Sequence, residues 1–218
     1  MSQGGLTEKY LAIRNSIPAH VSLVAVSKFH PIESIKQVYD TGQHIFGENR
    51  VQELVEKKPL LPPDIEWHMI GTLQSNKVKY IAPFVSLIHS VDSPKLLVEI
   101  NKQAQKNNRV INCLLEVHIA KEESKSGFSL QEADAFLFDV STHPSYIKIK
   151  GLMGMATFTN DAQQVRSEFK SLATLHKKHR LSLGLEYLSM GMSNDYQIAI
   201  EEGSNMVRIG SLIFGERK

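Results

Sequence analysis

Cysteine is almost absent from this sequence of 218 residues, which contains only Cys113. A single thiol excludes an intrachain disulfide and a cysteine-based metal cage, and we expect no metal site. Cys113 lies in the apolar stretch VINCLLEV, where a buried structural thiol is expected rather than a reactive nucleophile.

Long apolar runs and an excess of one charge sign are also lacking. No run approaches the roughly 18 apolar residues of a membrane-spanning helix, and the opening MSQGGLTEKY contains no apolar signal core. The 25 basic and 23 acidic residues leave a net charge of +2, which offers no basic face to nucleic acid. We therefore expect a cytoplasmic protein that binds neither membranes nor nucleic acid, and we take it to be a monomer.

No proline- or glycine-rich linker divides the chain, and LLPPD at residues 60–64 reads only as a turn. Hydrophobic residues make up 42% of the sequence and charged residues 22%, which is ordinary for a globular protein. The sequence therefore predicts a single domain that covers residues 1–218.

What the sequence does contain is a regular alternation of strand-like runs with helical patterns. Ile32, Ile35, Val38 and Tyr39 recur at helical spacing after the first run, and a similar pattern occupies residues 165–175. Strand alternating with helix predicts parallel pairing through crossovers. The eight predicted strands span residues 22–28, 44–49, 66–71, 85–91, 110–119, 147–155, 185–191 and 206–212.

Eight such units in a chain of this length predict an α/β fold, a (β/α)8 barrel at the short end of its usual size range. A doubly wound open sheet is the alternative. A further helix from about Leu6 to Ser16 precedes the first strand. We expect it either to plug the bottom of the barrel or to pack outside it.

A lysine follows directly after the first predicted strand. The run VSLVAVSKFHP, residues 21–31, is largely apolar until Lys28. Burying an ammonium group costs several kcal/mol unless it is paired or loses its proton, so Lys28 is either solvated or used. A lysine that snorkels out of a strand end is the structural alternative.

Barrel enzymes place their chemistry on the loops that follow the carboxyl ends of the strands. That rule selects Lys28 after the first strand. It also selects polar and glycine-rich segments after later strands, at residues 48–50, 71–76, 189–194 and 208–211.

The last strand carries an arginine that is predicted to point inward. Period-two alternation in MVRIGSL places Arg208 on the same face as Met206 and Gly210, opposite Ile209. An inward guanidinium requires an acceptor. An ion pair between Arg208 and a structural carboxylate, such as Glu48, is the structural alternative to a ligand.

Phosphate is a frequent ligand of the loops after strands seven and eight in barrels. Gly210 and Ser211 offer backbone N–H groups and a hydroxyl at the end of strand eight. In the loop SMGMSND, which carries Ser189 and Gly191, Ser193 is predicted to cap a helix whose amides can hold an anion. A cap without any ligand is the structural alternative.

A lysine and a phosphate site at one rim indicate a Schiff base with a phosphorylated aldehyde. The aldehyde is either pyridoxal phosphate or a phosphosugar. Because a guanidinium only donates, Arg208 facing a pyridine nitrogen would keep that nitrogen unprotonated and make the ring a weak electron sink.

Several motifs extend this interpretation over nearly the whole chain. They are AVSKFHP, FGENRVQE, EWHMIGTLQSNK, HSVDS, SKSG, GLMGMATF, LSMGMSND and MVRIGSLIFGER. Together they closely resemble the pyridoxal phosphate homeostasis proteins, whose single barrel is similar to the N-terminal domain of alanine racemase. The resemblance implies that the cofactor is pyridoxal 5′-phosphate.

The resemblance also implies roles for individual residues. Lys28 would carry the cofactor as a Schiff base, and Arg208 would approach the pyridine nitrogen. The phosphate would be held by Ser189 or Ser193 together with Gly210 and Ser211.

Asn49 and His68 would lie near the ring, although a structural histidine is an equal alternative for His68. Lys125, in EESKSGF, matches a second family lysine that is thought to assist cofactor transfer; a solvated lysine is the alternative.

Two features depart from the family pattern. His118 stands where an asparagine is expected, and the sequence ends at FGERK without the basic tail of some relatives.

Three functions are open: a carrier, an amino-acid racemase and a barrel aldolase that uses Lys28. In alanine racemases, which this barrel resembles, the second base is a tyrosine aided by a second domain, and we expect no such domain after Gly215. None of the tyrosines falls in a motif that supplies this base: Tyr10, Tyr39, Tyr80, Tyr146, Tyr187 and Tyr196. We therefore expect a non-catalytic carrier for intracellular homeostasis, which supplies pyridoxal phosphate to apo enzymes.

Overall fold

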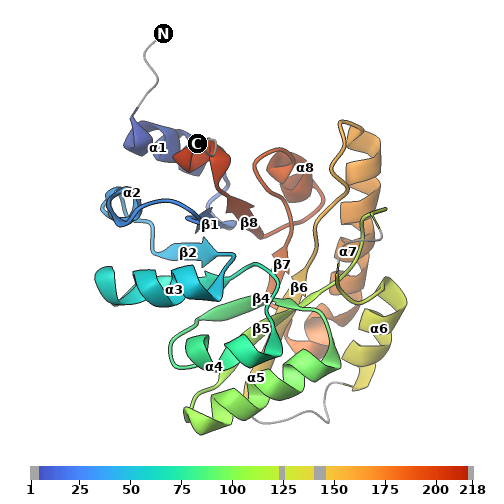
Figure 1. The fold of residues 1–218 in the computed structure, drawn as a ribbon. Helices are drawn as coiled ribbons and strands as arrows, with labels where there is room; N and C mark the ends of the chain where they lie inside the picture. Colours follow the sequence, from blue (N-terminus) through green and yellow to red (C-terminus); the bar gives the residue numbers. More distant parts are fainter. Residues whose placement is uncertain (1–4, 123–125, 140–145, 216–218) are drawn as a thin grey trace.

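In the computed structural model, residues 5–122, 126–139 and 146–215 are described. Eight parallel strands form one closed barrel in the order of the sequence (Figure 1). The prediction of a (β/α)8 barrel is therefore confirmed, and the open-sheet alternative is wrong. The strands are β1 (Ser22–Val26), β2 (Ile45–Glu48), β3 (Glu66–Met69), β4 (Leu87–Val91), β5 (Ile111–Glu116), β6 (Ile147–Met153), β7 (Tyr187–Ser189) and β8 (Met206–Ile209).

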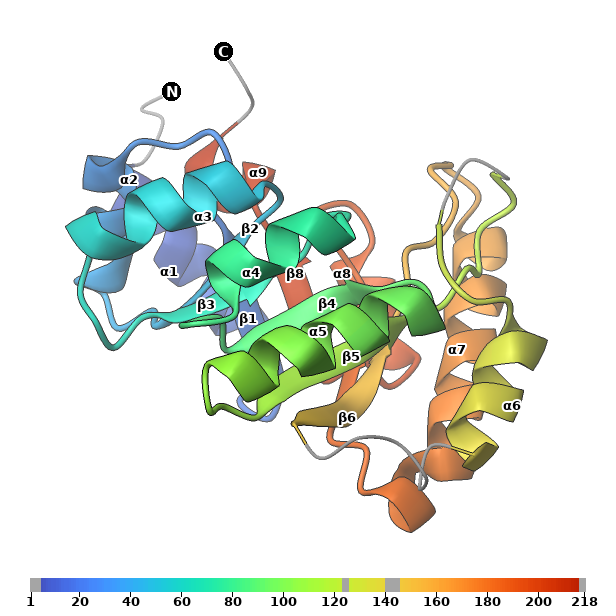
Figure 2. The same cartoon turned by 60° about the horizontal axis from the view of Figure 1, so that its bottom comes forward.

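Each strand lies within its predicted range. Helices surround the barrel that the strands form (Figure 1). The α-helices are α1 (Leu6–Ser16), α2 (Ile32–Tyr39), α3 (Val51–Lys57), α4 (Val78–Ile81), α5 (Pro94–Lys106), α6 (Leu130–Asp139), α7 (Ala162–Leu183), α8 (Tyr196–Glu201) and α9 (Ser211–Phe214). The 3-10 helices are η1 (Lys58–Leu60) and η2 (Ser75–Lys77). Figure 2 shows α5 lying against β4 and β5, and α6 beside α7.

The longest helix, α7, shows how local sequence sets the boundaries of an element. Asp161 precedes it, and its carboxylate accepts the backbone N–H groups of Gln163 and Gln164 at 3.0 and 3.1 Å. Gly184 ends it with a φ of 63°, a left-handed conformation that glycine adopts without strain. Asp161 and Gly184 are thus the sequence signals for the start and end of the helix.

The first helix packs on the outside of the barrel. It lies against α2 and the short α9, so that it fills the ring of helices next to β1 and β8 (Figure 1). The buried Tyr10 hydroxyl donates to Gln43 at 3.1 Å, and the Gln43 amide donates to the Leu23 carbonyl at 2.8 Å. Of the two expected positions for this helix, the outer one is therefore correct.

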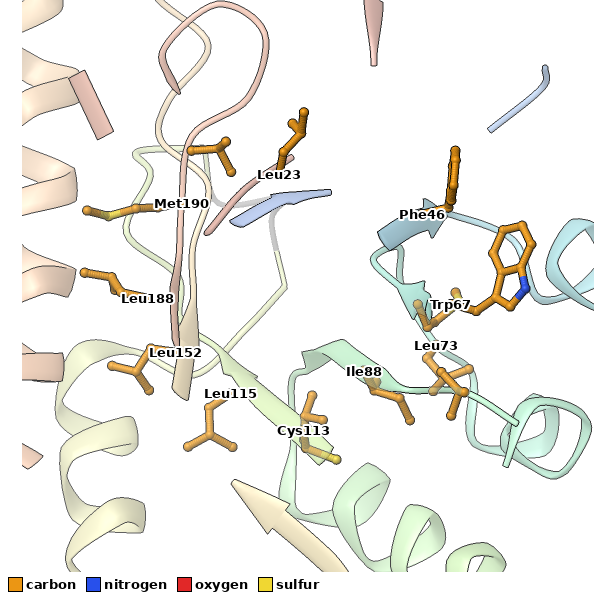
Figure 3. Packing of buried hydrophobic residues seen from close by; sticks show 14 of the residues in the cluster. Leu23, Phe46, Trp67, Leu73, Ile88, Cys113, Leu115, Leu152, Leu188 and Met190 are labelled. Atoms are coloured by element: carbon orange, nitrogen blue, oxygen red, sulfur yellow. The ribbon is translucent and has the colours of Figure 1, made fainter. Parts of the chain in front are cut away.

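The apolar core divides into an outer and an inner part. The outer cluster lies between strands and helices and includes Leu23, Trp67 and Cys113 (Figure 3). Burial raises the pKa of the Cys113 thiol, which agrees with a structural role. A small inner cluster fills the barrel interior with Val24, Leu87, Leu114, Met153 and Met206.

The sequence predicts neither a membrane-spanning helix nor a metal site. None of the helices in the described part of the chain is both long and apolar enough to cross a bilayer. Within the same ranges, no three histidine, cysteine, aspartate or glutamate side chains gather in a way that could hold a metal ion.

Candidate functional site

A cavity of about 820 Å³ opens at the carboxyl ends of the strands. Its walls come from the segments after β1, β2, β3, β6, β7 and β8, and all of these except the segment after β6 belong to the rim selected by the sequence. The cavity brings together six of the predicted site residues: Lys28, Asn49, Ser193, Arg208, Gly210 and Ser211.

Lys28 lies in a tight turn directly after β1. The Ser27 N–H donates to the Gly47 carbonyl of β2 at 3.0 Å, and the His30 N–H turns back to the Ser27 carbonyl at 3.1 Å. Phe29 has a φ of 66°, which is rare for a bulky residue and occurs where surrounding contacts hold it. The turn places the partly buried Lys28 in the cavity wall.

Arg208 points into the barrel, as the alternation in β8 predicts. It is only 4% exposed, and one guanidinium nitrogen donates to the Ser189 carbonyl at 3.0 Å and to the Ser189 hydroxyl at 2.6 Å. Burial lowers the pKa of Arg208 to about 10, while Asp195 and Glu116 act in the opposite direction. Arg208 is therefore still a cation at neutral pH and can only donate.

Glu48 does not accept from Arg208. Its carboxylate is fully buried and accepts from the Ser27 hydroxyl at 2.7 Å and from Lys57 at 2.9 Å. The predicted alternative of an Arg208–Glu48 ion pair is therefore wrong, because Glu48 is held on the β1 side by Lys57.

A chain of polar groups extends from Arg208 through the barrel interior. The Ser189 hydroxyl lies 3.1 Å from Nδ1 of His89, and Nε2 of His89 lies 3.0 Å from Nδ1 of His68. Burial lowers the pKa of His68 to about 3 and that of His89 well below its usual value, so both imidazoles are neutral. Neither Ser189 nor His68 is among the described residues that line the cavity. The hydrogen bond of His68 to His89 is the kind of contact expected of a structural histidine, which is the alternative for this residue.

Sequence reasoning did not find His89, although a signal for it exists. Leu87 of β4 belongs to the inner cluster, and period-two alternation places His89 on the same inward face. His68 occupies an inward position on the neighbouring β3, between the outward Trp67 and Met69. Inward histidines on adjacent strands are the pattern that predicts the pair.

The loop after β7 differs from its prediction. Helix α8 begins at Tyr196 with Asp195 at its N-cap position, so Ser193 does not cap it. The chain first makes a turn in which the Asp195 N–H donates to the Met192 carbonyl at 3.1 Å and the Asp195 carboxylate accepts the Met192 N–H at 2.6 Å. This turn delays the helix and leaves Ser193 in the cavity wall.

Two glycines allow close approach of backbones at the rim. A Cβ on Gly71 would lie 2.4 Å from the Asn49 carbonyl oxygen, and a Cβ on Gly210 would lie 3.1 Å from the Val26 carbonyl oxygen. Glycine at 71 therefore lets the segment after β3 support Asn49. Glycine at 210 lets the end of β8 pack beside the end of β1, which brings Arg208 and Lys28 to one cavity.

The loop after β6 forms a wall of the cavity that the sequence did not reveal. Thr157 and Phe158 line it, and the Thr157 N–H and hydroxyl both donate to the buried Glu168 of α7 at 2.7 Å. The Phe158 N–H donates to Glu122 at 3.0 Å, which links this loop to the one after β5.

The two remaining predictions concern residues that follow β5 in the sequence. Lys125 falls outside the described residues. His118 follows β5, its backbone N–H donates to the Phe128 carbonyl at 2.8 Å, and its buried Nε2 atom has no hydrogen-bond partner among the described residues. His118 is not among the described residues that line the cavity.

Comparisons with known proteins agree with this geometry. Residues 2–218 match the family described as alanine racemase, N-terminal domain. A pyridoxal phosphate homeostasis protein of Aquifex aeolicus is 43% identical over 199 residues, which cover 90% of this chain and 87% of that protein. The structure of PipY from Synechococcus elongatus PCC7942 with PLP bound is 34% identical, has a TM-score of 0.87 and covers 97% of this chain and 100% of that one. Alanine racemase from E. faecalis, 18% identical with a TM-score of 0.74 over 97% of this chain and 58% of its own, shows a likeness of fold alone.

Proposed function

Because this chain belongs to the pyridoxal phosphate homeostasis protein family, within the alanine racemase N-terminal domain family, we propose that it binds pyridoxal 5′-phosphate at the carboxyl ends of its strands. In this proposal the protein holds the cofactor as a Schiff base on Lys28 and supplies it to apo enzymes. It acts as a carrier in cofactor homeostasis and not as a catalyst.

The single observation that carries this proposal is the composition of the cavity. Pyridoxal phosphate needs an amine for its aldehyde, donors for its phosphate and a polar partner for its pyridine nitrogen. Lys28 supplies the amine, Ser211 after β8 and Ser193 supply donors, and Arg208 supplies a cation. When bound, the cofactor contributes an electrophilic aldehyde and a ring that accepts electrons.

Arg208 adjusts the electronic character of the ring. Its guanidinium is buried and already donates to Ser189, so its plane is fixed. Its pKa of about 10, lowered by burial, keeps it charged at neutral pH. A cation that can only donate keeps the pyridine nitrogen unprotonated, and an unprotonated ring stabilises carbanions poorly. This favours storage of the cofactor over catalysis.

The titratable groups of the cavity favour the same conclusion. Among the described lining residues these groups are Lys28, His30, Asp195 and Arg208, with no tyrosine. His30 stacks on Phe214 with ring centroids 4.7 Å apart, and burial lowers its pKa. A racemase needs a donor and an acceptor on opposite faces of the substrate carbon, and Asp195 is already engaged with the Met192 amide.

The first test of this proposal is the site of attachment. Linkage joins the Lys28 nitrogen to the aldehyde carbon with loss of water, and borohydride reduces the product to a stable amine. We expect peptide mass mapping after reduction to find the added mass on Lys28, and the Lys28→Ala protein to lose the visible absorbance of the linked cofactor. An adduct confined to any other lysine would show that the site is wrongly assigned.

A further inference from the structure

One largely buried cluster of charges, Glu48, Lys57 and the partly exposed Glu53, holds both peptide groups that flank Lys28. The carbonyl of the preceding peptide, Ser27 O, accepts from Nζ of Lys57 at 2.9 Å. The N–H of the following peptide, at Phe29, donates to Oε2 of Glu53 at 2.7 Å. The backbone on either side of Lys28 is thus bonded to a side chain of α3.

Lys57 is the centre of this cluster. It is 8% exposed, and besides Ser27 O its ammonium donates to Glu48 and to Glu53, each at 2.9 Å. These contacts use all the N–H donors of a lysine ammonium. The Lys57 ammonium therefore connects the Ser27 carbonyl to the Glu53 carboxylate. That carboxylate in turn accepts the Phe29 N–H on the other side of Lys28.

The carboxylates are also fixed within the cluster. Burial raises the pKa of Glu48, and Lys57 and the Ser27 hydroxyl oppose this effect. Burial acts in the same direction on Glu53, but hydrogen bonds from Lys57 and the Phe29 amide outweigh it and lower the pKa of Glu53. Glu53 is therefore an ionised acceptor for the Phe29 amide at neutral pH.

The turn needs such support because its backbone is strained. Phe29 has a φ of 66°, which a bulky side chain adopts only where its surroundings compensate. The Arg50 guanidinium lies 5.1 Å from the centre of the Phe29 ring and adds a second contact. Without the cluster, the chain would relax toward an ordinary φ, and this rotation at Phe29 would turn the Lys28 side chain away from its present direction.

We propose that Lys57, acting through Glu53, is a positioning residue that fixes the turn of Lys28 and so aims its amine at the aldehyde of the cofactor. This inference rests on the proposed function, because it assigns a role toward Lys28 as the attachment site. Lys57 does not line the cavity among the described residues, so its effect reaches the cofactor only through the backbone of the turn.

The test separates attachment from binding. Apo protein is mixed with pyridoxal 5′-phosphate and the rate of covalent attachment is followed by absorbance; affinity is measured separately with pyridoxine 5′-phosphate, which has an alcohol in place of the aldehyde. For Lys57→Met we expect attachment to slow by about 10- to 100-fold, since small misplacements of a reacting group have effects of this size. The Kd for pyridoxine 5′-phosphate should change by less than about twofold, because phosphate and ring contacts are retained. Lys36→Met, at an exposed position of α2, is the control and should match the wild type.

A second pair of variants keeps the test decisive if Lys57→Met folds poorly. Glu53→Ala removes the acceptor of the Phe29 amide and should slow attachment, whereas Glu53→Gln keeps an acceptor oxygen and should restore the rate to within about threefold of the wild type. Equal rates in Glu53→Ala and the wild type, or a parallel loss of attachment and pyridoxine 5′-phosphate binding in both Ala and Gln variants, would overturn the positioning role. Failure of the proposed function looks different, because the wild type itself would then show no adduct on Lys28.

Discussion

Arg208 shows how much one side chain contributes to this site. A buried guanidinium costs free energy unless its donors are paired, and here the Ser189 carbonyl and hydroxyl and the Gly154 carbonyl accept from it. These acceptors come from β7 and the end of β6, so Arg208 also ties three neighbouring strands together. A donor fixed in this way would meet the ring of the proposed cofactor without reorganisation.

Ser211 gives a direct test of the phosphate position. Ser211→Asp would place a carboxylate where we propose the phosphate, and repulsion between like charges should raise the Kd for pyridoxine 5′-phosphate by about tenfold or more at low salt. Ser211→Asn has a similar shape without the charge and should raise it by less than about threefold. Titration followed by fluorescence measures both. Equal affinities of the two variants would place the phosphate away from the end of β8.

Single residues were predicted where one local pattern sufficed. Alternation in β8 gave the inward direction of Arg208, and a cation directly after an apolar strand singled out Lys28. Ser193 is predicted to cap a helix, but Asp195 is at the N-cap position of α8. The reason is a turn closed by the hydrogen bond from the Asp195 N–H to the Met192 carbonyl, and the spacing of residues in the sequence does not reveal such a bond. Lys57 was not singled out, since in sequence it is one of two adjacent lysines where a charged helix ends, and only tertiary contacts bury it.

Whole elements were predictable because their patterns are long. Strands of a parallel barrel are covered on both faces, so they read as apolar runs, and each observed strand lies inside its predicted range. For the loops, the sequence predicted only where they lie along the chain and not the contacts that hold them. The wall formed by Thr157 and Phe158 depends on hydrogen bonds to Glu168 and Glu122, which lie 11 and 36 positions away in the sequence. Contacts of this kind leave no periodic signal.

The attachment of the β6–α7 loop predicts a stability effect. Glu168 is buried and accepts from the Thr157 N–H, the Thr157 hydroxyl and the Gln164 amide. Glu168→Ala leaves these donors without a partner and should lower the free energy of unfolding by about 1–3 kcal/mol. Glu56→Ala, at an exposed position of α3, is the control and should change it by less than about 0.5 kcal/mol. Urea denaturation measures both, and equal midpoints for the two variants would contradict the assigned role of Glu168.

At the scale of the whole barrel, the first and last strands bring the proposed attachment site together. Lys28, Arg208 and the end of β8 converge on one cavity because β1 and β8 are neighbours in the closed sheet. The closing contact lies beside Gly210, where backbones approach closely. The fold thus brings the first and last parts of the sequence to one site, and α1 packs on α2 and α9, the helices that follow β1 and β8.

This arrangement predicts transfer of the cofactor without turnover of amino acids. General acid–base assistance contributes about 10² to 10⁴ in rate per well-placed group, and in our proposal Arg208 is a donor that would keep the ring nitrogen unprotonated. Holo protein incubated with several L-amino acids in heavy water should therefore incorporate α-deuterium at a rate close to that of free pyridoxal phosphate. The same holo protein should reactivate an apo pyridoxal-dependent enzyme, and Lys28→Ala, prepared in the same way, should reactivate it no faster than buffer. Rapid racemisation of any one amino acid, abolished by Lys28→Ala, would instead identify the protein as a racemase, with His30 and Asp195 as the first residues to examine for the second base.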